Sequence, residues 1–147
     1  MLTAHKKIEQ QLTVLLRRSV RIHMMTQHDD LALERSAYAI LSKLADEGPQ
    51  RLGVLAAAFG LDSSTITRQV RALEQASLAV RERDPSDGRV FLLRLTDHGR
   101  DVLRQTRRHR RARLQQALVD WPDVDLEEFG RLLHEFNVSL QRLDENN

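Results

Sequence analysis

Cysteine is absent from this chain of 147 residues, and aromatic side chains make up only 4% of it. Without cysteine the chain can form no disulfide framework, no thiolate zinc site and no cysteine nucleophile, and it cannot sense oxidants through a thiol. The shortage of aromatic rings leaves aliphatic side chains to fill a core, which favours helices over a β-sandwich. No apolar run approaches the ~18 residues of a membrane span, and no N-terminal apolar segment indicates secretion. We therefore expect a cytoplasmic protein without a membrane partner.

Lysine is also scarce. Of the 23 Lys and Arg residues, 3 are Lys and 20 are Arg. The formal net charge is only +2, but the charge is unevenly distributed. Residues 51–113 carry 14 Arg and 7 acidic residues, a net charge of +7, whereas residues 114–147 carry 2 Arg and 8 acidic residues, a net charge of −6. The middle segment is thus either a surface for a polyanion or a solvated face balanced by the acidic end.

The N-terminal part of the chain has helical periodicity, and the length of the chain fits one domain over residues 1–147. Apolar residues at positions i, i+4 and i+7 predict an amphipathic helix over 5–28. A second helix is expected over about 34–46, because Gly48 and Pro49 would end it.

The C-terminal part also predicts long helices. Thr96 is a typical cap for a helix that runs to about residue 119, where Trp121 and Pro122 break it. A last helix is expected over 124–143, where apolar residues recur every three or four positions, as in a coiled coil. That apolar seam consists of Leu126, Phe129, Leu133, Phe136, Leu140 and Leu143.

Two shorter helices are expected between these long ones. The apolar stretch 52–59 predicts a helix that ends at Gly60, a residue suited to a left-handed cap. Asp62 is a typical N-cap for a further helix over 63–76. Two helices joined by so tight a turn have the spacing of a helix-turn-helix. The apolar face of the second helix consists of Ile66, Val70 and Leu73.

After the second of these helices the period changes to that of strands. Residues 78–83 and 90–95 are β-compatible, and the stretch 84–89 between them is dense in turn formers, so the three together predict a hairpin. A helix-turn-helix followed by a hairpin is a winged helix. The predicted fold is therefore mainly α, a winged helix-turn-helix with a two-stranded β wing between long terminal helices. Because one winged helix cannot bury the apolar stripes of these terminal helices, we expect them to dimerise across a two-fold axis.

The order of elements and several short signatures resemble the MarR family of bacterial transcriptional regulators. The matching residues run from about 33 to 100 and the helix plan extends the resemblance over nearly the whole chain. The signatures are the stretch 59–74, the wing pattern Asp84-x-x-Asp87-x-Arg89, and Leu95-Thr96-x-x-Gly99 at the start of the next helix. One departure is Ser77, which stands where family members usually carry a glycine before the first wing strand.

The resemblance implies a DNA-binding winged helix over 33–99 and a helical dimerisation region formed by 1–30 and 100–147. It also implies a sequence-specific, homodimeric transcriptional regulator, expected to be a repressor that a small-molecule ligand releases from DNA. The expected partner is double-stranded DNA with a pseudo-palindromic operator, whose half-sites lie about one helical turn apart.

The helix 63–76 is expected to enter the major groove. Arg68 is predicted to contact a base, because its guanidinium fork fits O6 and N7 of guanine. Arg71, about one turn further on, is expected to meet phosphate. The hydroxyls that could contact phosphates, base edges or thymine methyl groups belong to Ser63, Ser64, Thr65 and Thr67.

In the wing, Arg89 is predicted to enter the minor groove, where a narrow A·T tract concentrates negative potential. Asp87 would repel phosphate, so we expect it to orient Arg89 through a charge-assisted hydrogen bond. Asp84 is expected to brace the base of the wing, although simple turn capping explains it nearly as well. Arg81 and Arg83 alternate out of the first wing strand and could reach phosphates.

The Arg run between residues 100 and 113 places several guanidinium groups on one side of the predicted helix. It could flank the DNA or pair with the acidic residues at 120–128. In the family's plan, only the start of this helix lies near DNA, so ion pairing or solvent is the favoured interpretation from Arg107 onward.

Signals for ligands other than DNA are weak. In the family, small phenolic or anionic effectors often bind between the dimer helices and the winged helix, where His23, Met24, His28 and Tyr38 of this chain could line a crevice. Core packing explains Met24 and Tyr38 equally well. The six His residues form no metal-binding spacing, and we expect no metal site and no cofactor.

Two other classes of function compete with the regulator. A winged helix can serve as a protein-interaction module without specific DNA binding, and the acidic last helix with its apolar seam could dock such a partner. Against this stands the Arg89 wing signature, which such a module would not need. An enzyme is not expected, because no nucleophile–base pair, P-loop or metal spacing provides catalytic residues.

Overall fold

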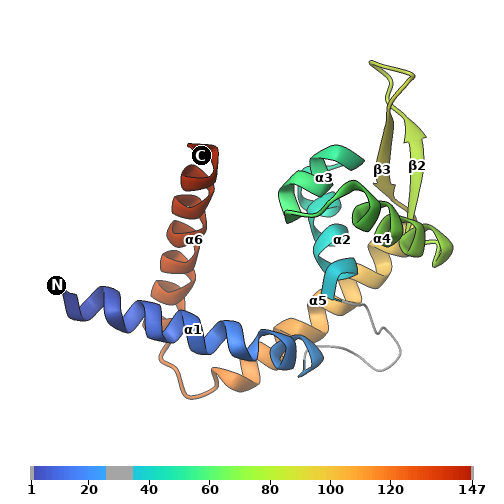
Figure 1. The fold of residues 1–147 in the computed structure, drawn as a ribbon. Helices are drawn as coiled ribbons and strands as arrows, with labels where there is room; N and C mark the ends of the chain where they lie inside the picture. The colour runs from blue at the N-terminus through green and yellow to red at the C-terminus, as the bar shows by residue number, and fades with distance from the viewer. Residues whose placement is uncertain (1, 26–34, 147) are drawn as a thin grey trace. The chain divides into compact units, whose positions relative to one another are not determined.

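The computed structural model describes residues 2–25 and 35–146 (Figure 1). The chain divides into two compact units, Met1–Arg111 and Ala112–Asn147, and each is described by itself. The helices are α1 (Leu2–Met25), α2 (Arg35–Glu47), α3 (Leu52–Phe59), α4 (Ser63–Gln75), α5 (Asp97–Ala117) and α6 (Asp123–Glu145). The strands are β1 (Gln50–Arg51), β2 (Ala79–Arg83) and β3 (Phe91–Leu95). The predicted fold class, a mainly α protein with a winged helix, is confirmed, and the predicted elements are all present, with shifts of a few residues at the ends that the structure describes. Residues 26–28 of the predicted first helix and residue 34 of the second lie outside the described residues.

One strand was not predicted from the sequence. β1 is only two residues long, and it adds to the hairpin to give an antiparallel sheet of order β1-β3-β2. Gln50 and Arg51 pair with Leu93 and Leu92, while β2 pairs with β3 from Ala79 opposite Leu95 to Arg83 opposite Phe91. β1 thereby fixes the start of α3 against the central strand of the sheet.

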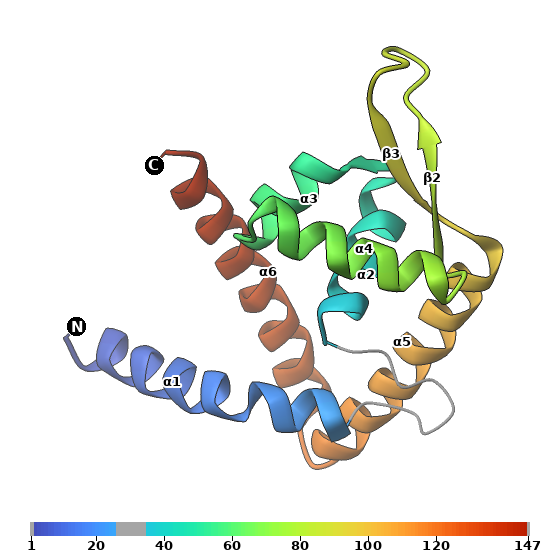
Figure 2. The same cartoon turned by 45° about the vertical axis from the view of Figure 1, so that its right-hand side comes forward.

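The core of the first unit lies where α2, α3, α4 and the start of α5 meet the base of the sheet. The predicted apolar face of α4, which consists of Ile66, Val70 and Leu73, is buried in it. Its other buried members are Ile40, Leu41, Leu44, Leu55, Ala56, Leu78, Ala79, Leu93, Leu95, Val102 and Leu103. In both views the β2–β3 hairpin extends beyond these helices, so its tip lies outside the core (Figures 1 and 2).

The turn between α3 and α4 has the predicted caps. Gly60 adopts the left-handed conformation, with φ 62°, and ends α3. Asp62 caps α4, because its Oδ1 accepts a hydrogen bond of 2.7 Å from the backbone N–H of Thr65. This bond, together with a hydrogen bond from the hydroxyl of Ser64, lowers the pKa of Asp62 to about 2. The first turn of α4 is thus held by an ionised carboxylate at neutral pH.

The junction between α4 and β2 contains the family departure seen in the sequence. Ser77 has φ 59°, and among the described residues it is the only one other than glycine with a positive φ. Its carbonyl accepts a hydrogen bond of 2.6 Å from the hydroxyl of Thr96, and Thr96 in turn accepts one of 2.9 Å from the backbone N–H of Gly99. The start of α5 is therefore fastened directly to the turn that follows α4, and the predicted role of Thr96 as a helix cap is confirmed.

The apolar stripes of the terminal helices remain exposed within the chain. In α6 no residue is buried, and the side chains of Phe129, Leu133 and Leu140 are 42–43% exposed. In α1, Ile8 and Leu15 are at least half exposed. Over the described ranges, no helix combines the length and the apolar character that a membrane span requires.

Candidate nucleic-acid interface

The exposed face of α4 carries the side chains that were predicted to read DNA. Arg68 and Arg71 are both exposed, one turn apart, on the side opposite the buried Val70. Ser63 and Ser64 are exposed at the start of the helix, while Thr65 and Thr67 are half-buried. α4 therefore packs with one face in the core and presents guanidinium and hydroxyl groups on the other.

Two of these hydroxyls already make hydrogen bonds within the helix. The Ser64 hydroxyl donates to Asp62 Oδ1 at 2.8 Å, and the Thr67 hydroxyl donates to the Ser63 carbonyl at 2.6 Å. Both oxygens can still accept a hydrogen bond, but their protons are engaged. On this helix the two arginines are accordingly the stronger candidates for donating hydrogen bonds to an anion or a base edge.

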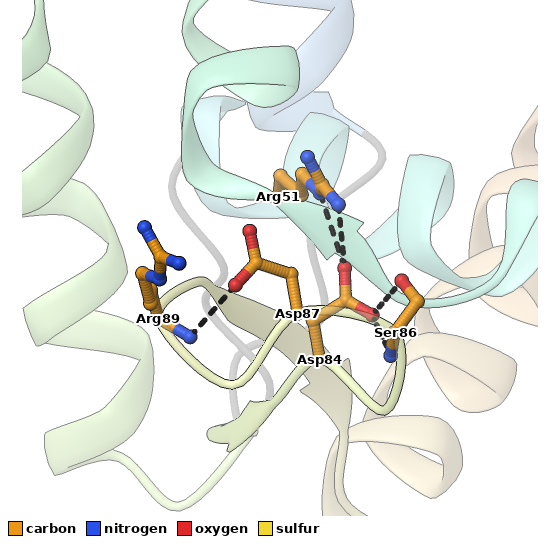
Figure 3. A network of polar contacts seen from close by, with 5 residues as sticks. All are labelled: Arg51, Asp84, Ser86, Asp87 and Arg89. Atoms are coloured by element: carbon orange, nitrogen blue, oxygen red, sulfur yellow. Dashed lines mark hydrogen bonds and ion pairs between the residues drawn. The ribbon is translucent and has the colours of Figure 1, made fainter.

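The loop end of the hairpin is held by a polar network centred on Asp84, which follows β2 and is 8% exposed (Figure 3). One carboxylate oxygen accepts from Arg51 Nη2 at 2.8 Å and from Arg51 Nε at 3.2 Å. The other accepts from the backbone N–H of Ser86 at 2.9 Å and from its hydroxyl at 2.7 Å. Asp84 therefore joins the hairpin turn to β1 through Arg51 and also caps the turn through Ser86, so both roles considered from the sequence, brace and turn cap, are seen.

The same network makes the stability of the hairpin depend on pH. The hydrogen bonds from Ser86, and after them those from Arg51, lower the pKa of Asp84 from 3.8 to about 2. A carboxyl whose pKa is lowered by folding stabilises the fold above its unfolded pKa, and this contribution is lost as pH falls from about 4 to about 2. The free energy of unfolding of Asp84→Asn should therefore lie below that of the wild type at neutral pH and approach it near pH 2. Urea unfolding across this range measures the difference, and a pH-independent difference would contradict the assignment.

Asp87 makes a different contact from the one predicted. Its Oδ1 accepts a hydrogen bond of 3.1 Å from the backbone N–H of Arg89, and not from the guanidinium (Figure 3). The short turn explains this, because an Asp side chain readily bonds the backbone N–H two residues ahead. Asp87 therefore shapes the loop, and in the part of the chain that the structure describes the Arg89 guanidinium has no hydrogen bond or ion pair.

Arg81 and Arg83 of β2, which were predicted to alternate out of the strand and to be able to reach phosphates, are both engaged within the protein. Arg81 Nε donates to Glu74 Oε1 of α4 at 2.8 Å, and its side chain is only 33% exposed. Arg83 Nη1 donates to the Gly88 carbonyl at 2.7 Å, and its guanidinium lies 5.4 Å from the centre of the Phe91 ring. Both side chains hold the hairpin in place.

An open groove of about 550 Å³ separates the start of α3 from the hairpin. Its lining includes the guanidinium-bearing residues Arg51, Arg81 and Arg89, together with the apolar Val54 and Phe91. Arg51 was not singled out from the sequence, although it opens the basic segment 51–113. Its side chain is 48% exposed while it pairs with Asp84, so it can bind a further anion from the solvent side.

The Arg run on α5 is partly neutralised by acids of the same unit. Arg107 Nη2 lies 3.0 Å from Asp46 of α2, and Arg104 Nη1 lies 3.0 Å from Asp101. The guanidinium of Arg110 lies 4.3 Å from the centre of the Tyr38 ring. Arg107 is thus ion-paired, as favoured from the sequence, but its partner is on α2 and not among residues 120–128.

The residues expected to line an effector crevice are only partly described. His28, and the side chains of His23 and Met24, lie outside the described part of the chain. Tyr38 is half-buried against the core and beneath Arg110, so packing accounts for it. Over the residues that the structure describes, no three His, Asp or Glu side chains gather as metal ligands.

Comparison with known proteins agrees with this geometry. A sequence model of the MarR family matches residues 33–91. The HTH-type transcriptional regulator YxaD of Bacillus subtilis, itself uncharacterised, is 41% identical over 130 residues, covering 88% of this chain and 90% of its own.

Two solved structures extend the likeness over nearly the whole chain. The crystal structure of Rv1404 from Mycobacterium tuberculosis has a TM-score of 0.77 and 28% identity, and the match covers 91% of this chain and 92% of that one. The crystal structure of MarR has a TM-score of 0.80 and 22% identity, over 95% and 94% of the two chains. The helix-turn-helix with its hairpin, the matching family model and a regulator that is 41% identical all lead to one conclusion: this chain belongs to the MarR family of transcriptional regulators.

Proposed function

We propose that the protein is a sequence-specific, homodimeric DNA-binding repressor, which a small-molecule effector releases from its operator. The observation that carries this proposal is the pairing of two basic surfaces in one compact unit. The exposed face of α4 presents Arg68 and Arg71, and the hairpin presents the Arg89 guanidinium without a partner among the described residues. A protein-interaction surface would not need such uncompensated guanidinium groups, whereas DNA phosphates and base edges bind them directly.

Each basic residue has a separate role in the proposed complex. Arg68 binds the O6 and N7 atoms of a guanine in the major groove, and Arg71 binds a backbone phosphate. Ser63 and Thr65 accept or donate weaker hydrogen bonds along the edge of α4, whereas Ser64 and Thr67 accept them. Arg89 enters the adjacent minor groove, and Asp87 holds its loop in the required shape. Arg51 binds phosphate next to the groove that it lines.

Two copies of the chain are proposed to bind one operator. The exposed apolar side chains of Phe129, Leu133 and Phe136 on α6, with Ile8 and Leu15 on α1, support burial against a second copy. A two-fold dimer requires a pseudo-palindromic operator with half-sites about one helical turn apart. An effector that changes the spacing of the two winged helices would release such an operator, because both helices α4 must fit successive major grooves together.

Footprinting tests this proposal. The purified protein should protect two half-sites related by two-fold symmetry, most simply within its own promoter region. The binding constant should fall steeply as salt rises, because each neutralised phosphate releases counterions. Transcription from the protected promoter, measured in vitro, should fall when the protein is added.

A gel shift with sheared genomic DNA distinguishes the competing function, a protein-interaction module without specific DNA binding. Retardation that does not depend on salt or sequence, or no retardation at all, would contradict the proposal and favour a protein-interaction module. Protection of a single unrepeated site would contradict the dimer. Increased transcription from the protected promoter would contradict the repressor role.

A further inference from the structure

Ser77 and Leu78 join the end of α4 to the start of α5, as both views show (Figures 1 and 2). Towards α4, their N–H groups donate to the carbonyls of Glu74 and Leu73 at 3.0 and 2.9 Å, which closes the last turn of that helix. Towards α5, the Ser77 carbonyl accepts from the Thr96 hydroxyl at 2.6 Å, and the Leu78 carbonyl accepts from the Thr96 N–H at 3.2 Å. Both N–H groups are thus engaged by α4, and both carbonyls by the residue that precedes α5.

The first turn of α5 lies too close to Leu78 to pivot freely on it. Gly99 is buried, and a Cβ on it would lie 1.9 Å from the Leu78 carbonyl oxygen. The Gly99 N–H donates to the Thr96 hydroxyl at 2.9 Å, so this hydroxyl is held from both sides. A tilt of α4 against α5 therefore has to break the hydrogen bonds of the Thr96 hydroxyl. Ser77, Leu78, Thr96 and Gly99 are referred to below as the α4–α5 joint.

The proposed contacts with DNA do not use the α4–α5 joint, although it lies at the end of the helix expected to read bases. α5 runs without a break from Asp97 to Ala117, beyond Arg111, where the first compact unit ends. It thus continues into the unit whose helix α6 is proposed to dimerise. The stiffness of the joint then limits how far the two α4 helices of a dimer can turn relative to one another.

We propose that the Thr96 hydroxyl, by stiffening the α4–α5 joint, determines how strictly the protein discriminates the spacing of two DNA half-sites. The inference rests on the proposed function, because spacing matters only when two copies bind one operator. One added base pair moves a half-site by about 3.4 Å and rotates it by about 35°. Each α4 can follow only by tilting against α5. Thr96 is a positioning residue in this proposal, because it acts through α4 and not through a contact with DNA.

Binding to duplexes of altered spacing tests the consequence for DNA. The duplexes carry the two half-sites found by footprinting, either at their native spacing or with one added base pair. The measured quantity is the ratio of the two dissociation constants. We expect this ratio to be roughly tenfold smaller in Thr96→Val than in the wild type, because the variant lacks the hydroxyl bonds that a tilt must break. Thr96→Ser keeps the hydroxyl and should restore the wild-type ratio.

Thr106 supplies a matched control on the same helix. It is 2% exposed, and its hydroxyl donates to the Val102 carbonyl at 2.8 Å within α5, without a contact to α4. Thr106→Val is thus the same chemical change away from the joint, and its ratio should stay within about twofold of the wild type. Circular dichroism confirms that the variants are folded. Ser77→Gly is a second variant of the joint that should fold at least as stably, and its greater backbone freedom should also reduce the ratio.

A measurement without DNA tests the α4–α5 joint itself. Because the chain contains no cysteine, spin labels can be attached through Gln75→Cys at the end of α4 and Gln105→Cys on α5, both at exposed positions. Labelled protein is diluted with an excess of unlabelled protein, so that electron–electron double resonance reports distances within one chain. We expect a narrow distribution of distances in the wild type and in Thr106→Val, and a broader one in Thr96→Val.

Several results would overturn the proposal. They are equal binding of the two duplexes by the wild type, a wild-type ratio in both Thr96→Val and Ser77→Gly, or an equal change of the ratio in Thr106→Val. Equally narrow distance distributions in Thr96→Val and the wild type would also overturn it. A missing two-fold footprint would instead contradict the proposed function, whereas the distances, which need no DNA, would still decide whether the Thr96 hydroxyl holds α4 to α5.

Discussion

Replacing Gly99 with alanine should destabilise the protein by at least about 4 kcal/mol, which is beyond the range of ordinary substitutions. A Cβ at this position would lie 1.9 Å from the carbonyl oxygen of Leu78 and 2.8 Å from its carbonyl carbon. Both atoms belong to the backbone, so no rotation of a side chain can relieve the contact. The start of α5 would have to move away from the turn between α4 and β2.

Such a movement would break several interactions at once. The Leu78 carbonyl accepts from the Thr96 backbone N–H at 3.2 Å, and the Thr96 hydroxyl joins the Ser77 carbonyl to the Gly99 backbone N–H. Leu78 itself, together with Val102 and Leu103, would lose contact within the core. Because a domain of this size is stable by only about 5–15 kcal/mol, the variant should lose between about a quarter and most of its free energy of unfolding.

Gly130 in α6 supplies the matched control for this prediction. An alanine Cβ there meets nothing within 4 Å, so Gly130→Ala should stabilise its helix by about 1 kcal/mol through intrinsic helix propensity. Urea unfolding followed by circular dichroism measures both variants. A loss below about 1 kcal/mol in Gly99→Ala would show that α5 does not pack against Leu78 as described.

Replacing Arg89 with alanine should weaken operator binding by about 1–3 kcal/mol, or roughly 5- to 150-fold. The guanidinium has no hydrogen bond or ion pair in the described chain, and the contact from Asp87 goes to the backbone, so the truncation leaves the loop in place. The loss should therefore come from DNA binding and not from folding. It should be largest on operators with A·T pairs beneath the hairpin, because a narrow minor groove attracts Arg most strongly there.

Arg94→Ala is the matched control in the same hairpin. Arg94 Nε is already bound to Glu82 Oε2 at 2.8 Å, so this variant loses the same formal charge without removing an available guanidinium. Its affinity for the operator should stay within about threefold of the wild type. Equal affinities of Arg89→Ala and the wild type would remove Arg89 from the interface, and equal losses in the two variants would reduce its role to general charge.

The sequence predicted the fold well because helix caps and apolar periodicity act locally. Asp62, Gly60 and Thr96 lie at the helix ends where their side-chain and backbone preferences place them. β1 escaped prediction because two residues are too few to show a period, and its pairing depends on Leu92 and Leu93 some forty residues later.

The partners of the charged residues were harder to predict than their exposure. The alternation of β2 correctly placed Arg81 and Arg83 away from the core, but it could not show that Glu74 and the Gly88 carbonyl lie within reach. Asp87 was assigned to the guanidinium of Arg89 on charge alone, whereas turn geometry favours the backbone N–H. Such pairings depend on three-dimensional proximity, so composition and spacing constrain them only loosely. Which bases the exposed residues contact stays a prediction.

The left-handed Ser77 has a practical consequence for protein engineering. A side chain at positive φ costs about 1–2 kcal/mol relative to a glycine, which adopts that conformation readily. Within the described part of the chain the Ser77 side chain makes no hydrogen bond in return. Its backbone alone is engaged, because its N–H donates to the Glu74 carbonyl and its carbonyl accepts from the Thr96 hydroxyl. Glycine at this position would thus give a more robust parent protein, in which the destabilising or binding-deficient substitutions of a mutational survey could be purified and compared while still folded.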